Sequence, residues 1–202
     1  MTRAAIGRRR FLLGGTTAFG TALAARSAAA QNEYAVFTEF SPANKLMVPG
    51  WNRRIFTDTD ARKGDSIKCD FATGVVSLAP GAYHLTGMSM VSYPSGGEPE
   101  TTTIRAPASA GYCRLRVFDP LAVVDSANLK AIDNGDRSII CIGSPSTPNL
   151  TPSLFDGYYA TDKTAQIVLE HQSGTAPQQI YLRVFVENSK WHAFARISIR
   201  RL

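Results

Sequence analysis

The sequence lacks most of the patterns that mark catalytic or membrane-spanning proteins. After residue 30 it contains no run of 18 consecutive apolar residues, so no membrane-spanning helix is expected there. It has no Cys-x-x-Cys pair, no His-x-His, no His-Glu-x-x-His, no Gly-x-Ser-x-Gly and no glycine-rich phosphate loop. These absences argue against zinc, serine-hydrolase and nucleotide-binding sites, and the sequence predicts no cofactor and no catalytic or metal-ligating residues.

The histidines are too scattered to form a metal site. His84, His171 and His192 fall on three separate expected strands. A metal site in a sheet normally takes two histidines that alternate on one strand, together with a carboxylate. Each histidine is therefore predicted to be a structural or surface residue.

Acidic residues gather in two expected loops, but none of them forms a dense Asp-x-Asp-x-Asp series. Calcium needs six to eight oxygen ligands that converge on one point. The sequence thus predicts no calcium site, but it does not exclude one at the acidic residues of these loops. These residues are Asp58, Asp60, Asp119, Asp125, Asp133 and Asp136.

A broad excess of positive charge is missing as well, although the formal net charge of the 202-residue chain is +6. Five of the 22 basic residues lie in residues 1–30, which hold no acid, and the remaining 17 face 16 acidic residues. The rest of the chain is thus close to neutral. We expect no nucleic-acid partner, because such a partner requires a basic surface.

The basic N-terminus carries the most specific motif of the sequence. The pair Arg8-Arg9 is followed, after one position, by Phe11 and Leu12. This spacing resembles the twin-arginine export signal, with Gly7 where Ser or Thr is usual. The apolar stretch that follows is too short to span a bilayer core of about 30 Å as a helix.

Small residues close this leader. The run 28–30 is Ala-Ala-Ala, which offers a signal peptidase the residues it needs, so cleavage is predicted between Ala30 and Gln31. A twin-arginine leader implies a bacterial protein that is folded before export and is released into the periplasm or outside the cell. The alternative is a basic amphipathic helix retained in the cytoplasm.

Helical periodicity is missing from the remainder of the chain. Apolar and polar residues alternate with a period of two across 166–171, 180–187 and 192–199, which predicts strands. Turn pairs such as Pro80-Gly81 and Asn134-Gly135 separate the strands, and this spacing is typical of an all-β antiparallel sandwich. The segment 144–163, with three prolines, is expected to be a long polar loop. The expected strands are 34–40, 52–57, 66–70, 73–79, 82–93, 101–106, 111–118, 137–143, 164–171, 179–187 and 192–200.

The order of features after Trp51 is distinctive. A short strand with Cys69 leads to 74–85, in which Pro80-Gly81-Ala82-Tyr83 joins two strands. Near the end, 167–172 and the Ala-x-Ile pattern of 191–199 close the chain. This order resembles the jelly-roll domain shared by the globular head of complement component 1q and the tumour necrosis factor family. The resemblance implies a jelly roll of about ten strands over 51–202, preceded by the signal peptide (1–30) and an N-terminal strand or tail (31–50).

The resemblance also implies self-association. Members of this family pack about a threefold axis through an apolar patch on the first, last and adjacent strands. That patch would consist here of Tyr34, Val36, Phe40 and Phe194, with Phe194 on the outer face of the final strand. The alternative is that these side chains belong to the core of one chain.

The cysteines number three, so at least one of them is unpaired within a chain. In the family arrangement the strands of Cys113 and Cys141 are neighbours, which implies a possible disulfide between them and a free Cys69. The alternative is that all three are small core residues.

Three classes of function stay open at this point. The first is an exported, non-enzymatic homotrimer with a binding, adhesive or structural role, whose further partner is an unknown protein or glycan. The second is a monomeric lectin-like domain that binds carbohydrate through Tyr93, Tyr158, Tyr159 and Trp191. The third, a periplasmic hydrolase or metalloenzyme, lacks the residue patterns that its chemistry needs.

Overall fold

The computed structural model describes six segments of the chain, 33–92, 110–119, 137–147, 150–173, 180–185 and 192–202. The leader, its cleavage site Ala30–Gln31 and the expected strand 101–106 lie outside the described residues. No helix long and apolar enough to cross a membrane occurs among the residues that the structure describes.

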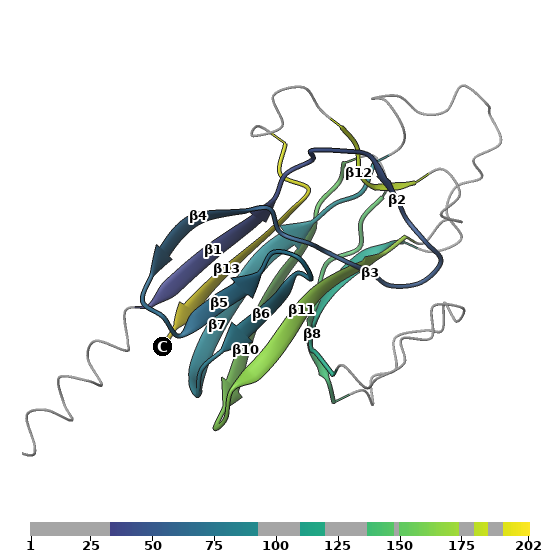
Figure 1. Cartoon of the computed structure of the whole chain (residues 1–202). Coiled ribbons are helices and arrows are strands. Elements are labelled where there is room, and N and C mark those ends of the chain that lie inside the picture. The colour runs from purple at the N-terminus through teal and green to yellow at the C-terminus, as the bar shows by residue number, and fades with distance from the viewer. Residues whose placement is uncertain (1–32, 93–109, 120–136, 148–149, 174–179, 186–191) are drawn as a thin grey trace, which may run out of the picture.

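Sheet A contains five antiparallel strands in the order β10–β7–β13–β1–β4 (Figure 1). The first strand, β1, pairs with the last strand, β13, in the interior of this sheet. The expected N-terminal segment therefore contributes a strand to the sandwich itself. The bounds are β1 Tyr34–Glu39, β4 Asp58–Lys63, β7 Gly81–Ser89, β10 Ser153–Thr161 and β13 Ala195–Arg201.

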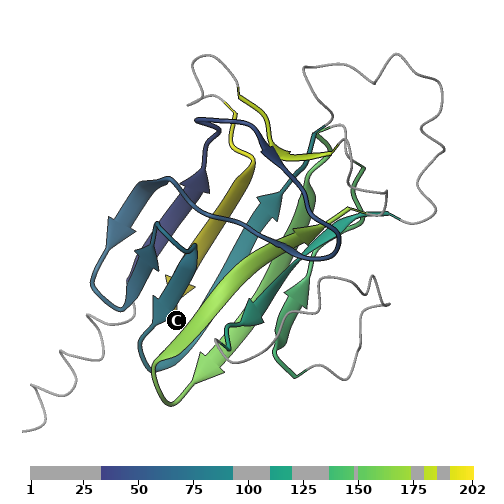
Figure 2. The same ribbon diagram turned by 45° about the vertical axis from the view of Figure 1, so that its right-hand side comes forward.

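Sheet B contains β5–β6–β11–β8–β9, with β3 paired to the end of β11. It faces sheet A, and the two together form an antiparallel jelly-roll sandwich, as predicted (Figure 2). The bounds are β3 Asn52–Arg53, β5 Ile67–Asp70, β6 Val75–Leu78, β8 Tyr112–Val117, β9 Ile139–Ile142 and β11 Ala165–Gln172.

A short pair of strands, β2 (Lys45–Leu46) and β12 (Tyr181–Arg183), lies at the end of the sandwich away from the C-terminus (Figure 1). We call this end the upper end. A small apolar cluster of its own lies there, made of Met47, Val91, Ile180 and Leu182. The upper end is thus closed by a layer that is separate from the main core.

The main core follows the predicted alternation. Ile167 and Leu169 of β11 and Ile197 and Ile199 of β13 all point between the sheets and are buried. Tyr83, the tyrosine of the Pro-Gly-x-Tyr sequence, is also buried, and its hydroxyl donates to the Ala79 carbonyl at 2.7 Å. A period of two places each of these residues on the inner face.

The prediction that 144–163 is a loop is wrong, because β10 occupies Ser153–Thr161. Its three prolines all precede the strand, and the remaining stretch alternates between inner and outer side chains. Strand β4 was not predicted either. It is an edge strand of sheet A with mostly exposed, charged side chains, so it has no apolar alternation.

The outward placement of Phe194 is also wrong. The inner set of the last strand is confirmed, since Ala195, Ile197 and Ile199 are buried, but Phe194 is fully buried as well. Its backbone N–H donates to the Glu39 carbonyl, and its carbonyl accepts from Met90 N–H, so it lies at the crowded upper end. Alternation along the last strand predicted an exposed outer face over its whole length, whereas the upper end of the sheet is covered.

Replacing Phe194 with Ala should therefore destabilise one folded chain by about 3–5 kcal/mol, as loss of a buried aromatic ring does. The matched control is Phe185→Ala, since Phe185 is 60% exposed, and its effect should stay within about 0.5 kcal/mol. Urea unfolding followed by circular dichroism measures both. Equal unfolding midpoints for the two variants would contradict the burial of Phe194.

Candidate functional site

The outer face of sheet A carries the most exposed large side chains of the sandwich. On β10, Leu154 is 58% exposed and Tyr158 is 68% exposed, and they flank Asp156 on the same face. Because β10 is an edge strand, this row lies at the border of the sheet. Neighbouring exposed apolar side chains on an ordered edge strand are candidates for a contact surface.

Tyr158 is held in place by its neighbours on β7 and β10. The ring of His84 stacks on the ring of Tyr158, with centroids 4.7 Å apart and an interplanar angle of 16°. His84 Nε2 in turn lies 2.9 Å from Asp156 Oδ2. In the register, Arg200 of β13 stands opposite His84. The result is an ordered aromatic platform with a carboxylate and a guanidinium beside it.

The expected interface residues are only partly brought together. Tyr34 and Val36 do lie on the outer face of sheet A, opposite Arg200 and Ser198 of β13. Tyr34 is exposed, whereas Val36 is half-buried. Phe40 is half-buried and lies just beyond β1.

One acidic residue of β4, Asp60, is engaged within the chain. Asp60 accepts from Thr38 Oγ1 at 2.7 Å and pairs with Arg196 at 3.3 Å. No group of three or more His, Cys, Asp or Glu side chains that could hold a metal ion occurs in the described part of the chain. The expected acidic positions 125, 133 and 136 lie outside it.

A buried polar cluster at the upper end was missed by the sequence analysis. Arg54 has no exposed surface, and its guanidinium donates to Ser89 Oγ at 2.8 Å and to the Leu182 carbonyl at 2.6 Å. It also donates to the Met90 carbonyl and pairs with Glu39 at 3.4 Å. A signal was present, because Arg54 stands at an inward position between the buried residues 52 and 56.

Ser89 and His171 form a hydrogen bond of 2.9 Å that resembles part of a catalytic dyad. Both residues are fully buried, so no substrate reaches them. The serine contacts Nδ1, while His171 Nε2 is buried without a partner. Burial, and secondly the charge of Arg54, hold the pKa of His171 well below its ordinary value. The pair is therefore structural, as predicted for this histidine.

The outer face of sheet B is closed by its own side chains. Glu170 is nearly buried, and Arg116 contacts both of its carboxylate oxygens at 2.9 and 3.0 Å. Arg114 donates to the same carboxylate at 2.8 Å, and Trp51 stacks on Arg114 at 4.0 Å. Arg53 covers the ring of Phe118 in the same way. Through these contacts, the charged side chains named here have partners within one chain.

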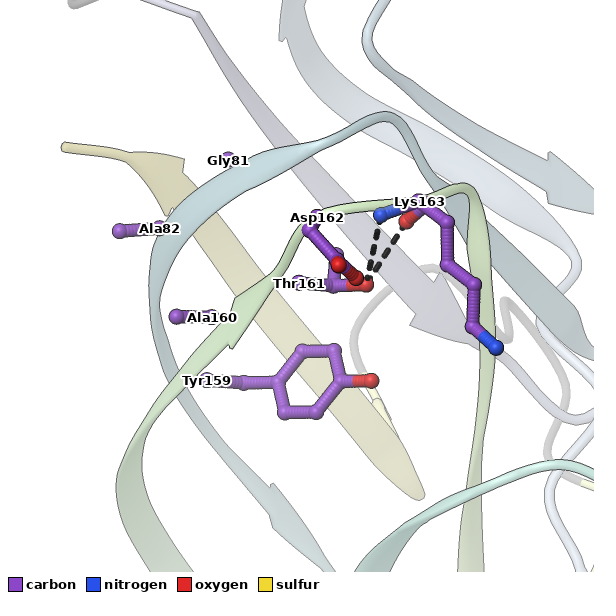
Figure 3. A pocket seen from close by; sticks show the side chains of 7 residues that line it. All are labelled: Gly81, Ala82, Tyr159, Ala160, Thr161, Asp162 and Lys163. Atoms are coloured by element: carbon purple, nitrogen blue, oxygen red, sulfur yellow. Dashed lines mark hydrogen bonds between the residues drawn. The ribbon is translucent and has the colours of Figure 1, made fainter.

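A pocket where the start of β7 lies beside the end of β10 offers little chemistry (Figure 3). Thr161 Oγ1 donates to the Lys163 carbonyl at 2.7 Å, which closes the turn. The pocket has one acid and one base and neither a histidine nor a cysteine. Its lining is Gly81, Ala82, Tyr159, Ala160, Thr161, Asp162 and Lys163.

The proposed carbohydrate-binding aromatics do not form one group. Tyr158 lies on the outer face of sheet A, whereas Tyr159 points inward and packs against the core. Tyr93 and Trp191 lie outside the described residues.

All three cysteines are free thiols. Cys113 and Cys141 do lie on neighbouring strands, β8 and β9, as the resemblance implies, but Cys141 stands opposite Leu115. The two cysteines are thus diagonal neighbours, whose Cα atoms are typically about 7–8 Å apart. Disulfides span Cα separations of about 4.4–6.8 Å, so the bridge would need a shift of this register, and the pairing stays a prediction.

No known family profile matches the chain, and no curated protein matches it. Among solved structures, the crystal structure of murine APRIL at pH 5.0 superposes with a TM-score of 0.47, and that at pH 8.0 with 0.48. Both are 9% identical and cover 85% of this chain and 99% of APRIL. At TM-scores below 0.5 this likeness carries no argument, and the fold rests on the strand order described above.

The thiols of Cys69 and Cys141 should be unreactive in the folded protein, because burial raises the pKa of each to about 12. At pH 8 we expect alkylation of each to be more than about 1,000-fold slower than that of an unperturbed thiol, since the thiolate reacts. Mass spectrometry after timed iodoacetamide treatment measures this. Rapid native labelling of Cys69 would contradict it.

The same labelling after unfolding without reductant counts the free thiols. Labelling of all three cysteines would agree with the structure, in which all three are free thiols. Labelling of Cys69 alone would establish the Cys113–Cys141 bridge.

Proposed function

We propose that this chain is an exported, non-enzymatic jelly-roll domain that assembles into a homotrimer. Its role would be binding, adhesion or structure in the periplasm or at the cell surface. The leader with Arg8-Arg9 supports export, and the resemblance to the complement component 1q and tumour necrosis factor family supports threefold assembly. The outer face of sheet A is the observation that carries the proposal.

A second copy of this chain suits that face because the two halves of the face differ in character. The β10 border presents Leu154, Asp156 and Tyr158, whereas the β13–β1 half presents Tyr34 and Arg200. A contact between the border of one copy and the opposite half of the next would join apolar surfaces and place Asp156 near a cation. Such a contact uses two different patches, and it closes into a ring of three when the rotation between copies is 120°.

Replacing Tyr158 with Glu should dissociate the trimer into folded monomers. An unpaired carboxylate would then have to lose its water in the contact, which costs several kcal/mol. Because Tyr158 is 68% exposed in one chain, the melting temperature of the monomer should change little. Sedimentation velocity and thermal melting of the mature protein measure the two effects.

The matched control is Phe185→Glu, because Phe185 is 60% exposed but lies beyond β12 at the upper end. It should leave the trimer intact. A wild-type monomer, or a Tyr158→Glu variant that is still trimeric, would refute the proposed contact.

A monomeric carbohydrate-binding domain is the second candidate, and the stacked pair His84–Tyr158 favours it. Tyr158 offers an exposed ring face of the kind on which a sugar ring can lie, and Asp156 accepts hydroxyl hydrogen bonds beside it. A glycan array distinguishes the two candidates. Binding that is lost in Tyr158→Ala, by a protein that sediments as a monomer, would favour this function over the trimer.

Export by the twin-arginine route has its own test. Replacing Arg8 and Arg9 with Lys should retain the protein in the cytoplasm in folded form, since the receptor requires both guanidinium groups and Arg and Lys are not interchangeable. Cell fractionation with immunoblotting measures the location. Normal amounts of the double variant outside the cytoplasm would show that the motif is not used.

A further inference from the structure

The guanidinium of Arg54 joins the elements that meet at the upper end. From its place just after β3, it reaches Glu39 of β1, Ser89 and the Met90 carbonyl at the end of β7, and the Leu182 carbonyl of β12. Two sheets and the β2–β12 pair are thus held by one buried cation. The position of the Arg54 guanidinium depends on the charges around it.

Positive charge exceeds negative charge in this cluster. Glu39 is the one carboxylate that pairs with Arg54 there, and it also pairs with Arg183 at 3.0 Å. Lys45 of β2 is close enough that Glu39, Arg183 and Arg54 all act on its pKa, although burial is the largest cause of its lowering. Three cations therefore share one carboxylate among the described residues, and two of these cations belong to the β2–β12 pair.

His171 adjoins this cluster from β11. Across the strands it faces Asn52 of β3 and the thiol of Cys113 on β8. Its Nδ1 contacts Ser89 Oγ at 2.9 Å, and the same oxygen accepts from Arg54 Nε at 2.8 Å. Asn52 is neutral, and the pKa of Cys113 is raised by burial, so neither supplies a negative charge.

The contacts of Ser89 bear on the protonation of His171. Ser89 Oγ accepts from Arg54, so its hydrogen is available to His171 Nδ1, and we infer that the neutral ring carries its hydrogen on the unpartnered Nε2. A further proton on Nδ1 would remove the acceptor of the serine hydrogen. It would also add a fourth cation to the cluster, without solvent and without a second carboxylate.

We propose that protonation of His171 opens the β2–β12 pair away from the upper end of the sandwich. Opening carries Lys45 and Arg183 into water, admits water to Arg54 and His171, and breaks the bond from Arg54 to the Leu182 carbonyl. It also exposes the apolar cluster of Met47, Val91, Ile180 and Leu182. The device is independent of the trimer proposed above, because none of its residues lies in the proposed contact.

The expected change in the opening equilibrium with pH follows from proton linkage. In the open form His171 titrates near its ordinary pKa of about 6.5, whereas in the closed form its pKa lies well below that value. The open form therefore binds more protons below pH 6.5, and its population rises as pH falls. Between pH 7 and pH 5 the opening equilibrium constant should grow by about 25-fold.

Hydrogen exchange of the full-length mature protein tests this. Ser92 N–H donates to the Tyr181 carbonyl and Tyr181 N–H donates to the Ser92 carbonyl, so both report opening of the pair. Their protection factors, corrected for intrinsic exchange, should fall by about 25-fold between pH 7 and pH 5. Amides of Leu169 and Ile197 in the main core should not change over this range.

The matched variant is His171→Asn, which keeps an acceptor for Ser89 but does not titrate. In this variant the protection of Ser92 and Tyr181 should be independent of pH between 7 and 5. Equal protection at both pH values in the wild type, or an unchanged fall in the variant, would overturn the proposal.

A measurement on the wild type covers the case in which the variant does not fold. Nuclear magnetic resonance of the His171 ring should show the Nε2–H tautomer at pH 7, and the ring should titrate together with the loss of protection at Tyr181. Titration of His171 with full protection at Tyr181 would equally overturn the proposal.

Discussion

The buried guanidinium of Arg54 is the interaction on which the upper half of this sandwich depends. Its donors end on a carboxylate, a hydroxyl and two backbone carbonyls that belong to β1, the end of β7 and β12. Removing one member of such a buried set typically lowers the free energy of unfolding by about 3–5 kcal/mol, because the remaining groups lose their partners where no water can replace them. Gly74 allows the backbone of Arg54 to take this position, because a Cβ atom at residue 74 would clash with the Arg54 carbonyl oxygen. At the lower end, the guanidinium of Arg201 donates to Ser66 Oγ and to the Pro80 carbonyl.

The two outer faces of the sandwich differ in a way that bears on function. On sheet B the charged groups have partners within the chain, since Glu170 pairs with Arg114 and Arg116 and Arg114 stacks on Trp51. On sheet A the aromatic side chains Tyr34 and Tyr158 stay exposed. One face is thus complete in the single chain, whereas the other has apolar surface to offer a partner.

The sequence was sufficient for the fold class and for most strands, because a period of two determines which side chains enter a core. It failed where strands lack that pattern, as in the charged edge strand β4, and where prolines upstream suggested a loop, as at β10. Alternation along the last strand misplaced Phe194, because this residue lies just before β13 and is fully buried. The cluster around Arg54 joins residues 39, 54, 89, 171 and 182, whose proximity depends on the tertiary fold.

The pairing of β1 with β13 has a consequence for how the protein is made. Sheet A cannot be completed until residues 195–201 have left the ribosome, because the last strand lies between β1 and β7. Pairing of the two ends of a chain requires closure of a very long loop, and folds of this kind form slowly. The sandwich can therefore be completed only after residues 195–201 have been synthesised, because a nascent chain without this segment has a gap between β1 and β7.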